Sequence, residues 1–110
     1  MDYKAILSRK LRTLFPDEEQ RNHVITILDT YGVEPHEQES SRVRLAILKL
    51  SDLDLEKIKR TTHFAKQDFR DILTWAEYPR QSKKPPLPDG PKKQKLIEAD
   101  RAEYEAWLNS

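Results

Sequence analysis

"RVRLAILKL", residues 42–50, contains the longest unbroken aliphatic run of the chain, at positions 45–48. Its apolar residues recur at intervals of three and four, which is typical of a helix, and they are Val43, Leu45, Ala46, Ile47, Leu48 and Leu50. Strand-like alternation fails over 46–48, and Ala, Leu, Arg and Lys all favour helix. Pro35 suits a first helical turn. We therefore expect a helix over about 35–50, with its apolar second half at the centre of a helical bundle.

Two amphipathic segments precede this stretch. Residues 3–14 place their apolar side chains on one helical face, and Pro16 ends that helix. Asp17 is a suitable N-cap for a second helix. That helix extends to about Tyr31 and ends at Gly32, which tolerates the left-handed conformation common after helices.

The segment that follows predicts helix from about 53 to 78. Its apolar positions keep an unbroken three-four spacing through Leu55, Ile58, Thr62, Ala65, Phe69, Ile72 and Ala76. "RTTHF" (60–64) is a poor helix former, so a kink or break is expected there, and Asp68 is placed to cap a restarted second half. The sequence leaves open whether residues 53–78 form one helix or two. Pro79 ends the segment.

Residues 79–91, "PRQSKKPPLPDGP", form a proline-rich basic linker that favours extended polyproline geometry. Residues 92–110 form a last, amphipathic helix. The predicted fold is all-α: a compact four-helix bundle over 1–78, with the fourth helix kinked or split, then this linker and the C-terminal helix.

Composition restricts the functions that fit. Hydrophobic residues make up 36% of the chain and charged residues 35%, which predicts a folded domain with a modest core. No cysteine is present, which excludes disulfides and thiolate chemistry and fits the cytoplasm. We expect no signal peptide and no membrane span.

Signatures of catalysis and cofactor binding are weak. Neither glycine lies in a phosphate-binding motif, and the three histidines lack metal-ligand spacing. "HEQE" (36–39) resembles an acidic first helical turn. We predict no catalytic, metal or cofactor-binding residues. An unrecognised enzyme, with His36 or His63 beside carboxylates in a cleft, stays an alternative.

"DFRDILTWAEYPR" (68–80), together with "RVRLAILKLS" (42–51), resembles a family of short, uncharacterised bacterial proteins. The resemblance covers roughly residues 40–80. It implies a helical cytosolic protein and carries no activity or binding residues.

The favoured function is a small non-enzymatic interaction or adaptor module. An apolar stripe on the last helix must be covered, either by its own bundle or by a partner or second copy of the chain. Docking on its own bundle is the favoured interpretation, because a small domain benefits from the added burial. The predicted contact residues are Ile97, Tyr104, Trp107 and Leu108. Basic residues near the linker would steer it towards an acidic surface, and these are Lys83, Lys84, Lys92 and Lys93.

Nucleic-acid binding is the second alternative. Basic residues on the third and fourth predicted helices are its candidates, namely Arg42, Arg44, Lys57, Lys59 and Arg60. Glu56, Asp68 and Asp71 interrupt this set, and a pI near 8.0 is low for a strongly basic domain, so solvated helix faces are the favoured interpretation.

Overall fold

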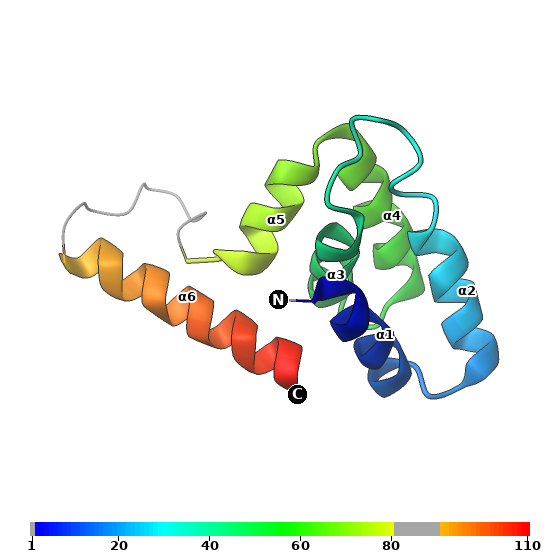
Figure 1. Cartoon of the computed structure of the whole chain (residues 1–110), viewed down its shortest axis with the longest axis horizontal. Coiled ribbons are helices and arrows are strands. Elements are labelled where there is room, and N and C mark those ends of the chain that lie inside the picture. Colours follow the sequence, from blue (N-terminus) through cyan, green and yellow to red (C-terminus); the bar gives the residue numbers. More distant parts are fainter. Residues whose placement is uncertain (1, 81–90) are drawn as a thin grey trace.

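The computed structural model describes residues 2–80 and 91–110, and these contain six helices and no strand. The helices are α1 (Tyr3–Leu14), α2 (Glu18–Leu28), α3 (Ser40–Leu50), α4 (Leu55–Gln67), α5 (Phe69–Glu77) and α6 (Pro91–Asn109), drawn in Figure 1. The all-α prediction is confirmed. None of the helices in the described part of the chain combines the length and apolarity that crossing a bilayer requires.

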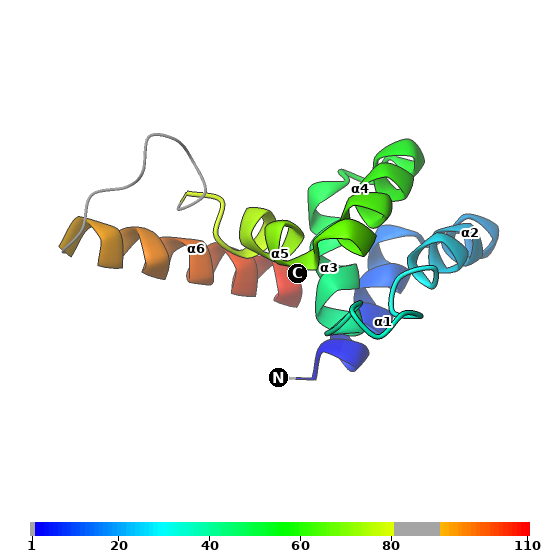
Figure 2. The same ribbon diagram turned by 90° about the horizontal axis from the view of Figure 1, so that it is seen from above.

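Helix α3 lies in the middle of the molecule and packs against α1, α4 and α5 (Figures 1 and 2). Val43, Leu45 and Ile47 are completely buried there. Full burial of such a side chain contributes about 1.5–3 kcal/mol, so this helix supplies much of the core. The expected central position of residues 42–50 is confirmed.

The segment between α2 and α3 differs from the prediction. Helix α2 ends at Leu28 rather than near Tyr31, and α3 begins at Ser40 rather than at Pro35. "HEQE" therefore belongs to a loop, and the interpretation as a first helical turn is wrong. Gly32 does take a positive φ, of 101°, as predicted. A Cβ there would lie 3.0 Å from the Cβ of Ser40, so glycine also allows this loop to approach α3 closely.

The segment predicted as one or two helices forms two. Helix α4 ends at Gln67, and Asp68 has an extended backbone with φ −153° and ψ 97°. The Asp68 carboxylate accepts a hydrogen bond from the Arg70 backbone N–H at 3.1 Å and so caps α5. The break lies after "RTTHF" and not within it, because the side chain that can cap a new helix lies at position 68.

Helix α6 packs against α5, and its C-terminal end lies near α1 (Figure 1). The predicted linker falls outside the described residues except for its ends, and so do Lys83 and Lys84. For Lys92 and Lys93 the structure describes the backbone of α6 but not the side chains.

Candidate functional site

Three of the four residues predicted to contact a partner from the last helix pack against the chain's own bundle, namely Tyr104, Trp107 and Leu108. Leu108 is 1% exposed and Tyr104 is 6% exposed, and both belong to the core. Trp107 packs partly buried against that core, and Ile97 is half-buried. In this structure Tyr104 and Leu108 of α6 are thus covered in cis.

Two cations of α1 bind the C-terminal end of α6. Lys10 Nζ donates to the Trp107 carbonyl and to the Ser110 hydroxyl, both at 2.8 Å, and lies 4.2 Å from the centre of the Trp107 ring. Arg9 donates to the carbonyls of Leu108 and Ser110. Positive charge at a helix C-terminus complements the helix dipole, and these bonds satisfy carbonyls that the helix leaves free. Burial, and secondarily the neighbouring Arg9, lowers the pKa of Lys10.

An ion pair holds the middle of α6. Asp100 is completely buried, and one of its oxygens accepts from the Arg80 guanidinium at 2.8 Å. Arg80 also contacts Glu103 at 2.7 Å. These contacts connect α6 to Arg80, which lies three positions after the last residue of α5.

The predicted nucleic-acid residues do not form one free basic face. Arg42 binds both carboxylate oxygens of Glu77, at 2.8 and 2.6 Å. Arg44 donates to the carbonyls of Leu28 and Tyr31, at 3.1 and 2.7 Å. These two arginines therefore connect helices within the fold.

Lys57, Lys59 and Arg60 remain on the surface of α4. Lys57 and Lys59 each lie 3.6 Å from an exposed carboxylate, that of Asp52 or Glu56. Arg60 makes no ion pair among the described residues. Only three of the five predicted cations are thus available to a ligand.

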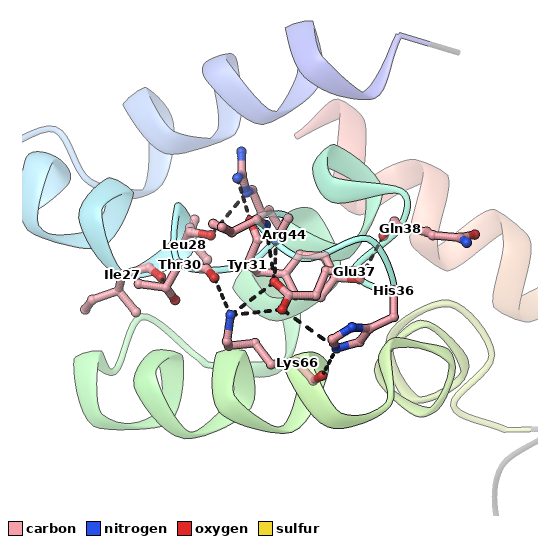
Figure 3. A network of polar contacts seen from close by, with 11 residues as sticks. Ile27, Leu28, Thr30, Tyr31, His36, Glu37, Gln38, Arg44 and Lys66 are labelled. Carbon is pink, nitrogen blue, oxygen red and sulfur yellow. Dashed lines mark hydrogen bonds and ion pairs between the residues drawn. The ribbon is translucent and has the colours of Figure 1, made fainter.

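The histidine and carboxylate that the fold brings together belong to a structural network (Figure 3). The Glu37 carboxylate, 1% exposed, accepts from the backbone N–H of Gly32 at 2.8 Å and from Lys66 Nζ at 3.0 Å. His36 Nε2 lies 3.8 Å from Glu37 and 3.1 Å from the Lys66 carbonyl. Desolvation alone would raise the pKa of Glu37, but the bonds from Gly32 and Lys66 outweigh it, so the pKa lies below its usual value.

This network offers little to catalysis. A general acid or base needs a pKa near the working pH and a free position for the proton. Glu37 has neither, because its pKa is lowered and its oxygens are occupied by donors within the fold. His63 Nε2 lies 3.3 Å from the side-chain amide of Gln67. No group of three or more His, Asp and Glu side chains within residues 2–80 and 91–110 is arranged to hold a metal.

A groove between α4 and α5 is a surface that was not predicted from the sequence. Phe64, 51% exposed, and Trp75, 45% exposed, line it together with the buried Ile72. These three residues border two adjoining hollows of about 290 and 240 Å³. We name this surface the α4–α5 groove. Leu50, Lys57, Arg60 and Thr61 line its first hollow, and Gln67, Asp68 and Asp71 line its second.

A signal for this groove is present in the sequence. Phe64 and Trp75 are large aromatic residues that fall off the apolar stripe of the predicted 53–78 helix. They lie 11 positions apart (75 minus 64), close to three full helical turns, so both would point to the same side of a helix. Two aromatic residues that share a side outside the buried stripe indicate a surface contact.

Comparison with known proteins assigns neither a family nor a function to the chain. No family model matches the chain, and no curated protein and no solved structure resembles it significantly. The resemblance to short bacterial proteins over residues 40–80 stays a prediction, and the function rests on the geometry described above.

Proposed function

We propose that the chain is a small non-enzymatic interaction module whose α4–α5 groove binds an amphipathic helix of a partner protein. The observation that carries this proposal is the half-exposed pair Phe64 and Trp75 on one groove. Leaving a large apolar side chain in water forgoes about 1.5–3 kcal/mol, and covering it with a partner recovers part of that energy. Aromatic residues that fill a partner's contact surface commonly dominate the binding energy.

A helix is the proposed occupant because of the shape of the groove. Two helices form its sides, and side chains on a helix surface are spaced so that those of a second helix fit between them. An amphipathic helix can therefore lay its apolar face into such a groove. The lining residues run along α4 from Lys57 to Gln67, ten positions (67 minus 57), which at 1.5 Å per residue is about 15 Å. That length matches about three turns of a bound helix.

The remaining architecture fits the same role. In this proposal the bundle carries the groove, the proline-rich linker over 79–91 is a spacer, and α6 completes the core rather than serving as the ligand. The burial of Tyr104 and Leu108 supports this division of roles. We also propose a cytoplasmic location, on the ground that the chain lacks cysteine.

The proposal is tested by substituting the aromatic pair. Wild-type chain, Trp75→Ala and the matched control Val33→Ala are immobilised and exposed to a lysate of the source organism. Val33 suits the control because it is 72% exposed and lies away from the groove. A protein retained by the wild type and the control, but lost with Trp75→Ala, is then purified and its binding measured directly.

The purified partner should bind Trp75→Ala and Phe64→Ala at least tenfold more weakly than the wild type, since such a residue at the centre of an interface contributes about 2 kcal/mol. Circular dichroism checks that both variants stay folded. Equal affinity for all variants would remove the groove from the proposed function. A measured hydrolase or transferase activity that survives purification would remove the non-enzymatic role.

A further inference from the structure

The α4–α5 groove carries opposite charges at its two ends. Lys57 and Arg60 line the first hollow, and Asp68 and Asp71 line the second. The shared apolar residues Phe64, Ile72 and Trp75 lie between the two ends. A partner in this groove therefore meets cations, then an apolar surface, then carboxylates.

The cations at the first end are open to a ligand. Arg60 makes no hydrogen bond and no ion pair with any described residue, so its guanidinium donors are unused. Lys57 is 50% exposed, and its contact to the exposed Asp52 is 3.6 Å long. An exposed pair of this kind contributes little, so a partner carboxylate replaces it readily.

The carboxylates at the second end are also accessible. Asp71 is exposed and its carboxylate has no partner among the described side chains. Asp68 uses one oxygen to cap α5 and lies 3.5 Å from Arg70 Nε. At least one unpaired negative charge thus remains for a cation of the partner.

We propose, on the basis of the proposed function, that the partner helix is bipolar. It carries Asp or Glu at the end that meets Lys57 and Arg60, and Lys or Arg at the end that meets Asp68 and Asp71. The span from Lys57 to Asp68 is 11 residues (68 minus 57), so the two charged positions lie about 11 residues apart on one face. Bulky apolar residues lie between the two charged ends, against Phe64 and Trp75.

The test uses two synthetic helical peptides of identical composition and identical apolar anchors. In the bipolar peptide the Glu residues lie at one end and the Lys residues at the other, and in the second peptide they are interleaved. Each is titrated into the isotope-labelled full chain and followed by NMR. The bipolar peptide should bind about threefold to tenfold more tightly at low salt, and the difference should vanish near 1 M salt.

Charge reversal in the chain provides the control. Lys57→Glu with Arg60→Glu should abolish the preference for the bipolar peptide. Lys59→Glu should preserve it, because Lys59 lies on the same helix but lines a different hollow, between α2 and α4. Retained preference in the double variant would overturn the bipolar assignment.

The outcomes separate the two proposals. Equal affinity for both peptides, with shifts centred on Phe64 and Trp75, overturns the bipolar assignment and supports helix binding by the groove. Absence of shifts at the groove with either peptide overturns both. Sedimentation is run in parallel: self-association that Trp75→Ala abolishes would identify the occupant as a second copy and would also overturn the bipolar partner.

Discussion

At the scale of single residues, Glu37 fixes the path of the loop that follows α2. Its buried carboxylate binds the backbone of Gly32 and Val33 and the ammonium of Lys66, so it joins the loop after α2 to α4 (Figure 3). The local sequence favoured an acidic first helical turn over "HEQE" (36–39), because acidic side chains there complement the helix dipole. Glu37 instead binds the nearby backbone of Gly32 and Val33 and the ammonium of Lys66, which lies 29 positions along the chain, and these bonds hold the segment as a loop.

Glu37→Gln should lower the free energy of unfolding by about 2 kcal/mol at pH 7, because it leaves the Lys66 ammonium and buried backbone donors poorly paired. Urea unfolding measures this loss. Glu34→Gln, an exposed carboxylate of the same loop, should change stability by less than about 0.5 kcal/mol. A cost for Glu37→Gln as small as that of the control would show that the buried network contributes nothing.

Acid should weaken the wild type through the same residue. The folded pKa of Glu37 is lowered, so its contribution is fully present above the unfolded pKa of about 4.3 and is lost as pH falls through the folded pKa. Urea midpoints measured between pH 7 and pH 3 should fall more steeply for the wild type than for Glu37→Gln. Parallel pH profiles would contradict this assignment.

At the scale of helices, the break between α4 and α5 creates the candidate site. The apolar stripe continues across Asp68, so both helices still pack on the core through residues such as Ala65 and Ile72. The change of direction at Asp68 leaves Phe64 and Trp75 beside a groove rather than on one straight helix. The stripe was predictable from spacing, whereas the direction of α5 depends on its packing against α3.

Asp68→Ala should lower stability by about 1 kcal/mol, because it removes the hydrogen bond that caps α5. Asp71→Ala is the matched control, since it removes the same charge from the first turn of α5 without removing a cap, and it should cost only a few tenths of a kcal/mol. Thermal unfolding of both variants checks the difference. Equal losses would assign the effect to charge rather than to capping.

At the scale of the whole molecule, α6 closes the core across a long sequence separation. Leu108 and Tyr104 pack with residues of the bundle, and Arg9 and Lys10 bind the carbonyls at the end of α6. A small domain gains from this burial, because short chains bury a limited fraction of their surface.

Leu108→Ala should lower the free energy of unfolding by about 2–4 kcal/mol, since it removes a fully buried side chain. Asn109→Ala, one position along and exposed, serves as the control and should have little effect. The midpoint of thermal unfolding should not depend on protein concentration, because α6 packs on its own bundle. A midpoint that rises with concentration would indicate docking of α6 on a second copy.

By itself, the amino-acid sequence determined the all-α class, the central position of residues 42–50 and the helix ends near Leu14, Leu50 and Pro79. These features follow from local spacing, caps and prolines, whose physical causes act within a few residues. Only the tertiary structure decided that 33–39 is a loop and that Phe64 and Trp75 line a groove, and it chose docking in cis from the two arrangements that the sequence left open for α6. Those outcomes depend on contacts between residues far apart in the chain, such as Glu37 with Lys66 and Lys10 with Trp107, whose energies no local pattern contains.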